Sequence, residues 1–285
     1  MTTVGNGNGG EFGFGRDENG IAIVDLRTES RRERHRREEE QGVRRARLYI
    51  IRHGQSHANA SWDAGGRYAA LPPPRHGPED SPLTQTGHDQ AMRLGERMRS
   101  FRFMSDRDHD NDRVDGSECS DREDEQKNET CSGVLFVSSP LTRALETSMG
   151  ILRGLGTLSK RMPALTIEPH IAEHIACESD KGRLRGELEM DFPGLSTELS
   201  RVFPDPEKTW WWSGRSRFGC EPFESLHDRL RAFHAYIGAK SRSYKTIIVV
   251  GHSTFIQQLF STSPVARKLA STRRLRNCEC VNVLL

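Results

Sequence analysis

The chain has 285 residues, of which 34% are hydrophobic and 29% are charged, and its formal net charge is +2. This length corresponds to one large domain or two small ones, and a net charge so close to neutral excludes a globally basic nucleic-acid-binding protein. The longest strongly apolar run, 247–250, is far shorter than the ~20 residues that cross a bilayer, and the N-terminus has no apolar signal-peptide core. We therefore expect a cytoplasmic protein without a membrane span. None of its six cysteines has CxxC spacing, so we expect reduced thiols rather than zinc ligands or disulfides.

Two stretches of the chain are too polar to contribute to a core. Residues 1–46 begin with a Gly/Asn-rich segment, and the run at 31–47 contains eight Arg and four Glu. Residues 105–130 hold eleven Asp or Glu against four Arg or Lys. Because so few apolar residues cannot offset the entropy of ordering, we expect a disordered N-terminal extension at 1–46 and a disordered acidic insertion at 105–130. The Arg-rich run is either a solvated helix or a basic arm that contacts phosphate or a membrane surface.

The rest of the chain, 47–285, alternates short apolar runs with amphipathic segments. Short apolar runs predict buried strands, and apolar residues at three- and four-residue spacing predict helices. In chain order this gives strands at 48–51, 134–137, 166–167, 246–250 and 281–285, with helices at 84–103, 140–152, 187–192, 197–202, 223–237 and 254–260. Strands that alternate with helices predict a layered α/β domain with a largely parallel sheet.

Polar side chains follow several of these strands at their carboxyl ends, where ligands bind in folds of this kind. Arg52 and His53 follow the first strand, Arg143 the second, Glu173 the third and His252 the fourth. This set suits a phosphate dianion, because arginine forks donate to phosphoryl oxygens, an imidazole can attack phosphorus and a carboxylic acid can protonate the leaving oxygen. Each residue alone is more typical of a structural or solvated side chain. Their shared placement at strand ends indicates a phosphoryl-transfer site.

Five segments resemble, in order, the signatures of the histidine phosphatase superfamily, also called the phosphoglycerate-mutase-like family. They are RHGQSHAN at 52–59, PLTQTGHDQA at 82–91, SPLTRALET at 139–147, a helix opening at 221–224 and VVGHS at 249–253. The resemblance extends from about residue 47 to residue 260 and favours the phosphatase-type branch. It implies a phosphoglycerate-mutase-like fold, a three-layer α/β/α sandwich with a mostly parallel central sheet.

The same resemblance implies roles for the site residues. His53 would be the nucleophile that passes through a phosphohistidine, and Glu173 would donate the proton to the leaving oxygen, with Glu168 and Glu178 as alternative acids. No metal or cofactor is implied, since positively charged and polar side chains balance the charge of the phosphoryl group. The residues expected to hold that group are Arg52, Asn59, Arg143 and His252, of which His252 also counts as catalytic.

The segment at 174–222 carries two further features. Lys181, Arg183 and Arg185 flank Gly182 and either reach an acidic substrate or belong to a solvated loop. Three consecutive tryptophans at 210–212 are more typical of docking this segment onto the core than of a wall for the substrate, because adjacent side chains cannot all face one site.

These features predict a metal-independent phosphatase, a phosphoric monoester hydrolase, whose partner is a phosphorylated small molecule or phosphoprotein. The alternatives are a phosphoglycerate-mutase-type phosphotransferase and a weakly active member that binds phosphorylated ligands. The first signature continues as His57-Ala58-Asn59, without the Trp-Asn pair typical of the mutases. Nucleic-acid binding by the run at 31–47 is not expected. The sequence determines neither the substrate nor the oligomeric state.

Overall fold

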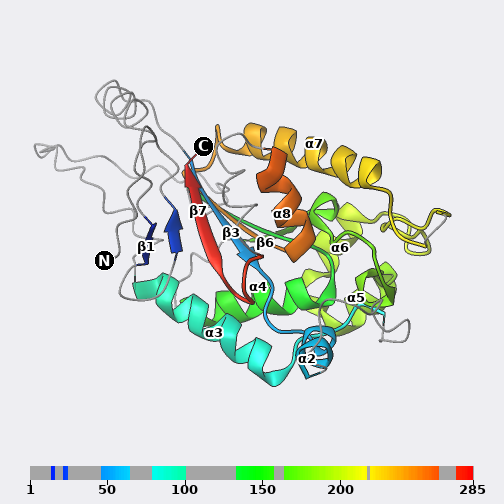
Figure 1. The fold of residues 1–285 in the computed structure, drawn as a ribbon, viewed down its shortest axis with the longest axis horizontal. Helices are drawn as coiled ribbons and strands as arrows, with labels where there is room; N and C mark the ends of the chain where they lie inside the picture. Colours follow the sequence, from blue (N-terminus) through cyan, green and yellow to red (C-terminus); the bar gives the residue numbers. More distant parts are fainter. Residues whose placement is uncertain are drawn as a thin grey trace, which may run out of the picture.

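The computed structural model describes residues 14–16, 22–24, 46–64, 79–100, 133–156, 164–216, 219–262 and 274–284. The centre of the described part is a seven-stranded sheet in the order β1-β2-β7-β3-β6-β4-β5 (Figure 1). The strands are β1 (Phe14–Arg16), β2 (Ala22–Val24), β3 (Arg47–Arg52), β4 (Val134–Ser138), β5 (Leu165–Ile167), β6 (Thr246–Gly251) and β7 (Cys280–Leu284). Strands β3, β6, β4 and β5 are parallel, whereas β7 runs antiparallel to β3 and β1 antiparallel to β2.

Helices cover both faces of this sheet (Figure 1). Helices α3 (Gln85–Ser100) and α4 (Thr142–Leu155) pack on one face, and α7 (Phe223–Lys240) and α8 (Ser253–Thr262) pack on the other. The connections that follow β3 and β5 contain α2 (His57–Ala64), α5 (Arg185–Asp191), α6 (Ser196–Val202) and the 3-10 helices η1 (Pro169–Ile171), η2 (Glu178–Asp180) and η3 (Pro193–Leu195). The architecture is the predicted three-layer α/β/α sandwich with a mostly parallel central sheet.

The two apolar cores follow from the side-chain period of a strand. In β3, Leu48 and Ile50 contact the core beneath α7 and α8, whereas Tyr49 and Ile51 contact the core beneath α3 and α4. Successive side chains of a strand point to opposite faces, so a strand covered on both faces consists of a continuous apolar run. That run is the pattern that predicted β3, β4 and β6.

Polar caps set the first residues of the two helices on the α3–α4 face. Helix α3 begins after Thr84, whose hydroxyl oxygen accepts the N–H of Gly87 at 3.1 Å, which is the hydrogen bond typical of an N-cap residue. Helix α4 begins at Thr142 rather than at the predicted residue 140, and the carboxylate of Asp80 accepts the N–H of Thr142 at 2.8 Å. Helix α2 was not predicted, because its sequence HANASWDA has no apolar stripe.

The N-terminal extension contributes two short strands to the edge of the sheet. We expected residues 1–46 to be disordered, yet β1 and β2 lie within this range and β2 pairs with β7 through Ala22 and Val281. The Arg-rich run up to residue 45 and the predicted acidic insertion at 105–130 lie outside the described residues.

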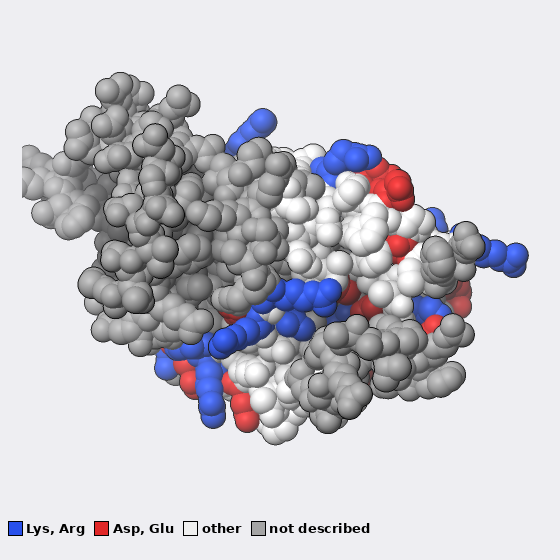
Figure 2. Space-filling model, viewed as in Figure 1, with Lys and Arg blue, Asp and Glu red and all other residues white. Residues whose placement is uncertain are grey.

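The described surface carries both signs of charge. On the face shown in Figure 2, a short row of Lys and Arg side chains lies near the centre, and acidic and basic side chains lie next to one another at the lower left and the upper right. Interspersed charge of this kind is typical of a solvated surface. Within the described ranges, no helix is both long enough and apolar enough to cross a membrane.

Helices α3 and α4 lie in direct backbone contact. A Cβ atom added to Gly95 of α3 would lie 2.1 Å from the carbonyl oxygen of Ile151 in α4. Backbone atoms cannot move aside as the end of a flexible side chain can, so only glycine permits this approach.

We expect Gly95→Ala to lower the free energy of unfolding by about 1–3 kcal/mol, because the added methyl group forces the two helices apart. Urea denaturation measures this change. The control is Gly238→Ala in α7, where an added Cβ meets no atom within 4 Å. There the substitution should raise stability by up to about 1 kcal/mol through helix propensity. Equal effects at the two positions would contradict the importance of the α3–α4 contact.

Candidate active site

The carboxyl ends of β3, β6 and β4 lie at one level of the sheet. The N–H of His53 donates to the carbonyl oxygen of Gly251 at 3.0 Å, and the N–H of Ser139 donates to that of Val250 at 3.0 Å. The residues that directly follow the three strands, including His252, are therefore neighbours. This is the edge at which parallel sheets bind ligands.

His53 is buried, with 3% of its surface exposed, and its ring is oriented by the backbone of the next residue. Its Nδ1 lies 2.6 Å from the carbonyl oxygen of Gly54. Because a carbonyl can only accept, Nδ1 carries the proton and Nε2 carries the lone pair. Burial, followed by the charges of Arg143 and Arg52, holds the pKa of His53 well below its ordinary value. The ring is thus neutral near pH 7, in the form that can attack phosphorus.

The second and third signature segments hold the residues that follow His53. The N–H of Gly54 donates to the hydroxyl oxygen of Thr147 at 3.0 Å. On the other side, a Cβ added to Gly87 would lie 2.2 Å from the carbonyl oxygen of Gln55, so only glycine fits against this loop. These contacts join three segments that are distant from one another in the sequence.

His252 is fully buried beside the first histidine, with 5.1 Å between the two ring centroids. Its Nε2 lies 2.8 Å from the hydroxyl oxygen of Ser139, whereas its buried Nδ1 has no hydrogen-bond partner among the described residues. Burial, followed by the charges of Arg143, His53 and Arg52, holds the pKa of His252 well below its ordinary value. Since buried polar atoms are normally satisfied, Nδ1 is suited to a ligand oxygen.

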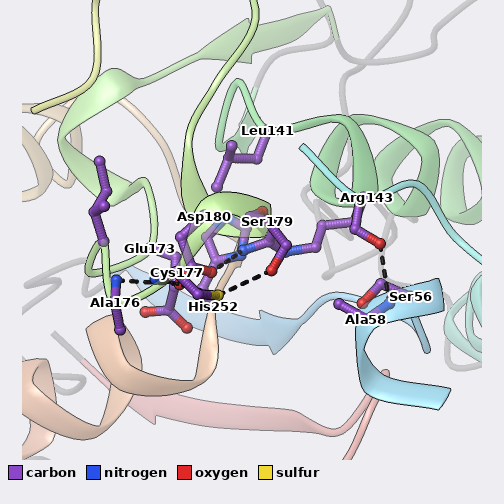
Figure 3. A network of polar contacts seen from close by, with 12 residues as sticks. Ser56, Ala58, Leu141, Arg143, Glu173, Ala176, Cys177, Ser179, Asp180 and His252 are labelled. Carbon is purple, nitrogen blue, oxygen red and sulfur yellow. Dashed lines mark hydrogen bonds and ion pairs between the residues drawn. The ribbon is translucent and has the colours of Figure 1, made fainter. Parts of the chain in front are cut away.

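Two guanidinium groups are fixed near the histidines. Arg143, the second residue of α4, donates to the carbonyl oxygen of Ser179 at 2.6 Å and to the carboxylate of Asp180 at 3.0 Å (Figure 3). Arg52, the last residue of β3, donates to the carbonyl oxygen of Leu275 at 2.7 Å. A guanidinium group held in this way has a defined orientation, which suits phosphate recognition.

Asn59 is oriented from two sides. Its Oδ1 accepts the N–H of Ser56 at 3.4 Å and the amide Nδ2 of Asn277 at 3.1 Å. The same Nδ2 of Asn277 donates to the carbonyl oxygen of His53 at 3.1 Å. With its oxygen engaged, Asn59 keeps an amide NH2 group as a donor.

Glu173 contacts the beginning of the helix that follows His252. Its Oε1 accepts the N–H groups of His174 at 2.9 Å and Phe255 at 3.0 Å, and its Oε2 accepts that of Thr254 at 3.1 Å. Two of these donors lie in the first turn of α8, whose N–H groups have no partner within the helix. The carboxylate is therefore both a cap for α8 and a neighbour of His252.

The two alternative acids have partners of their own. Glu168 lies 2.6 Å from the ring Nδ1 of His170, and Glu178 pairs with Lys181 at 2.7 Å on the surface. Among the hydrogen bonds of the described residues, none joins either carboxylate to the two site histidines.

The basic residues and tryptophans of 174–222 are engaged within the chain. Besides the pair of Lys181 with Glu178, Arg183 pairs with Asp80 at 3.3 Å and Arg185 donates to the carbonyl oxygen of Phe203 at 2.9 Å. Trp210 stacks on Phe203, with 5.4 Å between ring centroids. This contact agrees with the predicted docking role of the tryptophan run.

Three residues of the site were not predicted. Ser139, the partner of His252, lies inside the third signature and could have been inferred from it. Asp180 precedes Lys181 and Gly182 in a stretch that the sequence singles out without assigning Asp180 a role, and Asn277 lies in no motif. No group of three or more His, Cys, Asp or Glu suited to a metal ion occurs in the part of the chain that the structure describes.

Comparison with known proteins identifies the family. The model of the histidine phosphatase superfamily (branch 1) matches residues 48–106 and 124–284, which together exceed half of the chain. The interruption at 107–123 lies within the acidic stretch. No curated protein matches the sequence.

Several solved structures are similar to this chain. A putative alpha-ribazole-5'-P phosphatase from Escherichia coli is 20% identical, with a TM-score of 0.45 over 84% of this chain and 90% of the other. A mycobacterial glucosyl-3-phosphoglycerate phosphatase is 18% identical, with a TM-score of 0.46 over 85% of this chain and 91% of the other. The alpha-ribazole phosphatase from Shigella flexneri is 20% identical, with a TM-score of 0.44 over 83% and 89%.

The buried neutral histidines predict an acid-sensitive fold. Since the folded chain holds the pKa values of His53 and His252 well below 6.5, the unfolded chain binds more protons as the pH falls below about 6.5. The free energy of unfolding should therefore fall toward about pH 5, with each ring contributing up to about 1.4 kcal/mol per pH unit.

The variant His252→Asn lacks one of the two buried imidazoles. The free energy of unfolding of this variant should therefore depend less steeply on pH than that of the wild type. Urea denaturation at several pH values measures both slopes. Identical slopes would contradict the burial of a neutral ring at this position.

Proposed function

This chain belongs to the histidine phosphatase superfamily (branch 1), and we propose that it hydrolyses phosphate monoesters through a phosphohistidine on Nε2 of His53. The observation that carries the proposal is the state of the His53 ring. Its Nδ1 proton is directed at the Gly54 carbonyl and its pKa is depressed by burial, so Nε2 has a lone pair at neutral pH. A nucleophile prepared in this way beside fixed arginines suits attack on a phosphate dianion.

In the first step, Nε2 of His53 attacks phosphorus as the bond between phosphorus and the leaving oxygen breaks. Arg52 and Arg143 balance the charge on the phosphoryl oxygens, and Nδ1 of His252 donates to one of them. In a loose transition state, positioning and electrostatic stabilisation of this kind provide most of the catalysis. Asn59 supplies a further donor. The leaving alcohol takes a proton from Glu173.

In the second step, a water molecule attacks the phosphohistidine on the face opposite to Nε2. The carboxylate of Glu173 accepts the proton of this water, which restores the acid, and inorganic phosphate is released with His53 regenerated. A mutase-type transferase would differ only in the acceptor, a second substrate hydroxyl in place of water. The substrate class proposed is a phosphorylated small molecule or phosphoprotein.

The nucleophile is tested by His53→Ala with p-nitrophenyl phosphate as substrate. Because the variant has no group to form the covalent intermediate, kcat should fall by about 10³-fold or more. The control is His227→Ala on the exposed face of α7, which should keep the wild-type rate. Acid-labile phosphate should be trapped on the wild type and not on His53→Ala. A wild type that releases no inorganic phosphate from this ester or from a panel of phosphorylated metabolites between about pH 5 and 8 would contradict the proposed function.

The acid is tested separately, because Glu173 also caps α8. An alkyl phosphate has a poor leaving group that needs protonation, whereas p-nitrophenolate leaves readily without it. The first step alone distinguishes the two leaving groups, so in single-turnover measurements of phosphohistidine formation Glu173→Gln should lower the rate by about 10²-fold or more on glycerol phosphate and much less on p-nitrophenyl phosphate. Equal losses on the two substrates, together with a lower thermal midpoint, would assign Glu173 to capping alone.

A further inference from the structure

We propose that Asp180 is a positioning residue that sets the guanidinium of Arg143 for phosphoryl transfer. The inference rests on the phosphatase function proposed above. Asp180 ends η2, on a connection 37 residues away from Arg143 in the chain, and is directed at Arg143 across the site (Figure 3).

The carboxylate of Asp180 joins the arginine to a rigid turn. Its Oδ1 accepts from Arg143 at 3.0 Å. Its Oδ2 accepts the N–H of Ala176 at 3.2 Å, the N–H of Cys177 at 3.3 Å and the thiol of Cys177 at 3.2 Å. With Oδ2 engaged by three donors, the orientation of Oδ1 is determined by the turn. A second contact from the same turn, the carbonyl oxygen of Ser179 at 2.6 Å, fixes the other nitrogen of the fork.

The thiol of Cys177 is suited to this supporting contact. Burial, followed by the charge of Asp180, raises the pKa of Cys177 to about 11. At neutral pH the group is therefore an S–H donor and not a thiolate, so it stabilises the neighbouring carboxylate rather than repelling it.

A second connection fastens the same segment to the start of α4. Arg183 donates to the hydroxyl oxygen of Thr142 at 2.7 Å and pairs with Asp80 at 3.3 Å, while Asp80 accepts the N–H of Thr142 at 2.8 Å. From the outer side, the indole N–H of Trp210 donates to the carbonyl oxygen of Arg183 at 2.8 Å. The turn and the first residues of α4, which carry Arg143, are thus held as one unit.

This arrangement predicts that the loss of Asp180 lowers turnover without weakening phosphate binding. Two contacts hold the fork of Arg143, and the other N–H donors remain for phosphoryl oxygens in a defined orientation. Without Asp180 the fork is free to rotate, which reduces stabilisation of the transition state. At the same time a negative charge is lost beside the anion site, so attraction of phosphate is not weakened. A residue needed only for folding would lower both together.

The experiment compares the wild type with Asp180→Ala and Asp180→Asn on p-nitrophenyl phosphate, with inorganic phosphate as a competitive inhibitor. For Asp180→Ala, kcat should fall by about 10- to 100-fold, while KM and the inhibition constant of phosphate change by less than about threefold or decrease. Asp180→Asn keeps an oxygen acceptor for Arg143, so its kcat should lie between those of Asp180→Ala and the wild type. Thermal unfolding shows whether each variant is folded, and Asp180→Asn decides the test if Asp180→Ala does not fold.

The control is Asp228→Asn, which removes a carboxylate from an exposed pair with Arg231 on α7 and should leave kcat unchanged. A folded Asp180 variant with the wild-type kcat would overturn this inference and leave the proposed function intact. Equal losses in turnover and phosphate binding would do the same. A wild type without turnover would contradict the proposed function, and with it this inference.

Discussion

The parallel register of β3, β6 and β4 is the constraint on which the rest of the site depends. Because the three strands end at one level, His53, His252 and Ser139 leave the sheet as neighbours, and α4 begins close enough for Arg143 to reach them. The register itself is held by two apolar faces, since a shift of one residue would turn each core side chain to the wrong face. Core packing thus places these side chains closely enough for hydrogen bonds to form between them.

A buried site that gathers positive charge needs negative charge placed around it. Two carboxylates meet this need. Asp180 contacts Arg143, and Asp80 accepts from the first residue of α4, the helix that carries Arg143. Each also has several backbone donors or an arginine as partners, which offsets the cost of burying it. Among the described residues, His53 and His252 form no hydrogen bond with a carboxylate, and both rings stay neutral. A neutral imidazole is the form that a nucleophile requires.

The long connection between β5 and α7 is organised by a buried ion pair at its base. Glu221 receives Arg229 at 2.7 Å, and Arg229 also donates to the backbone oxygens of Ala172 and Glu173. Burial alone would raise the pKa of Glu221, but the hydrogen bonds and charge of Arg229 hold that pKa below its ordinary value. Through Arg229, the pair holds the backbone of Glu173 in place. Arg183 joins the later part of the connection to the first residue of α4.

The sequence by itself determined five of the seven strands of the sheet, most of the helices and the side chains of the candidate site, because strand and helix periodicity and the signature segments are local patterns. Only the tertiary structure decided the antiparallel direction of β7, the contact of Asp180 with Arg143 and that of Asn277 with His53. These partners are 37 and 224 residues apart in the chain, and a polar residue in a loop carries no local signal of the group that it will meet. The pairing of distant chain segments creates such contacts, so they become visible only when the sheet has brought those segments together.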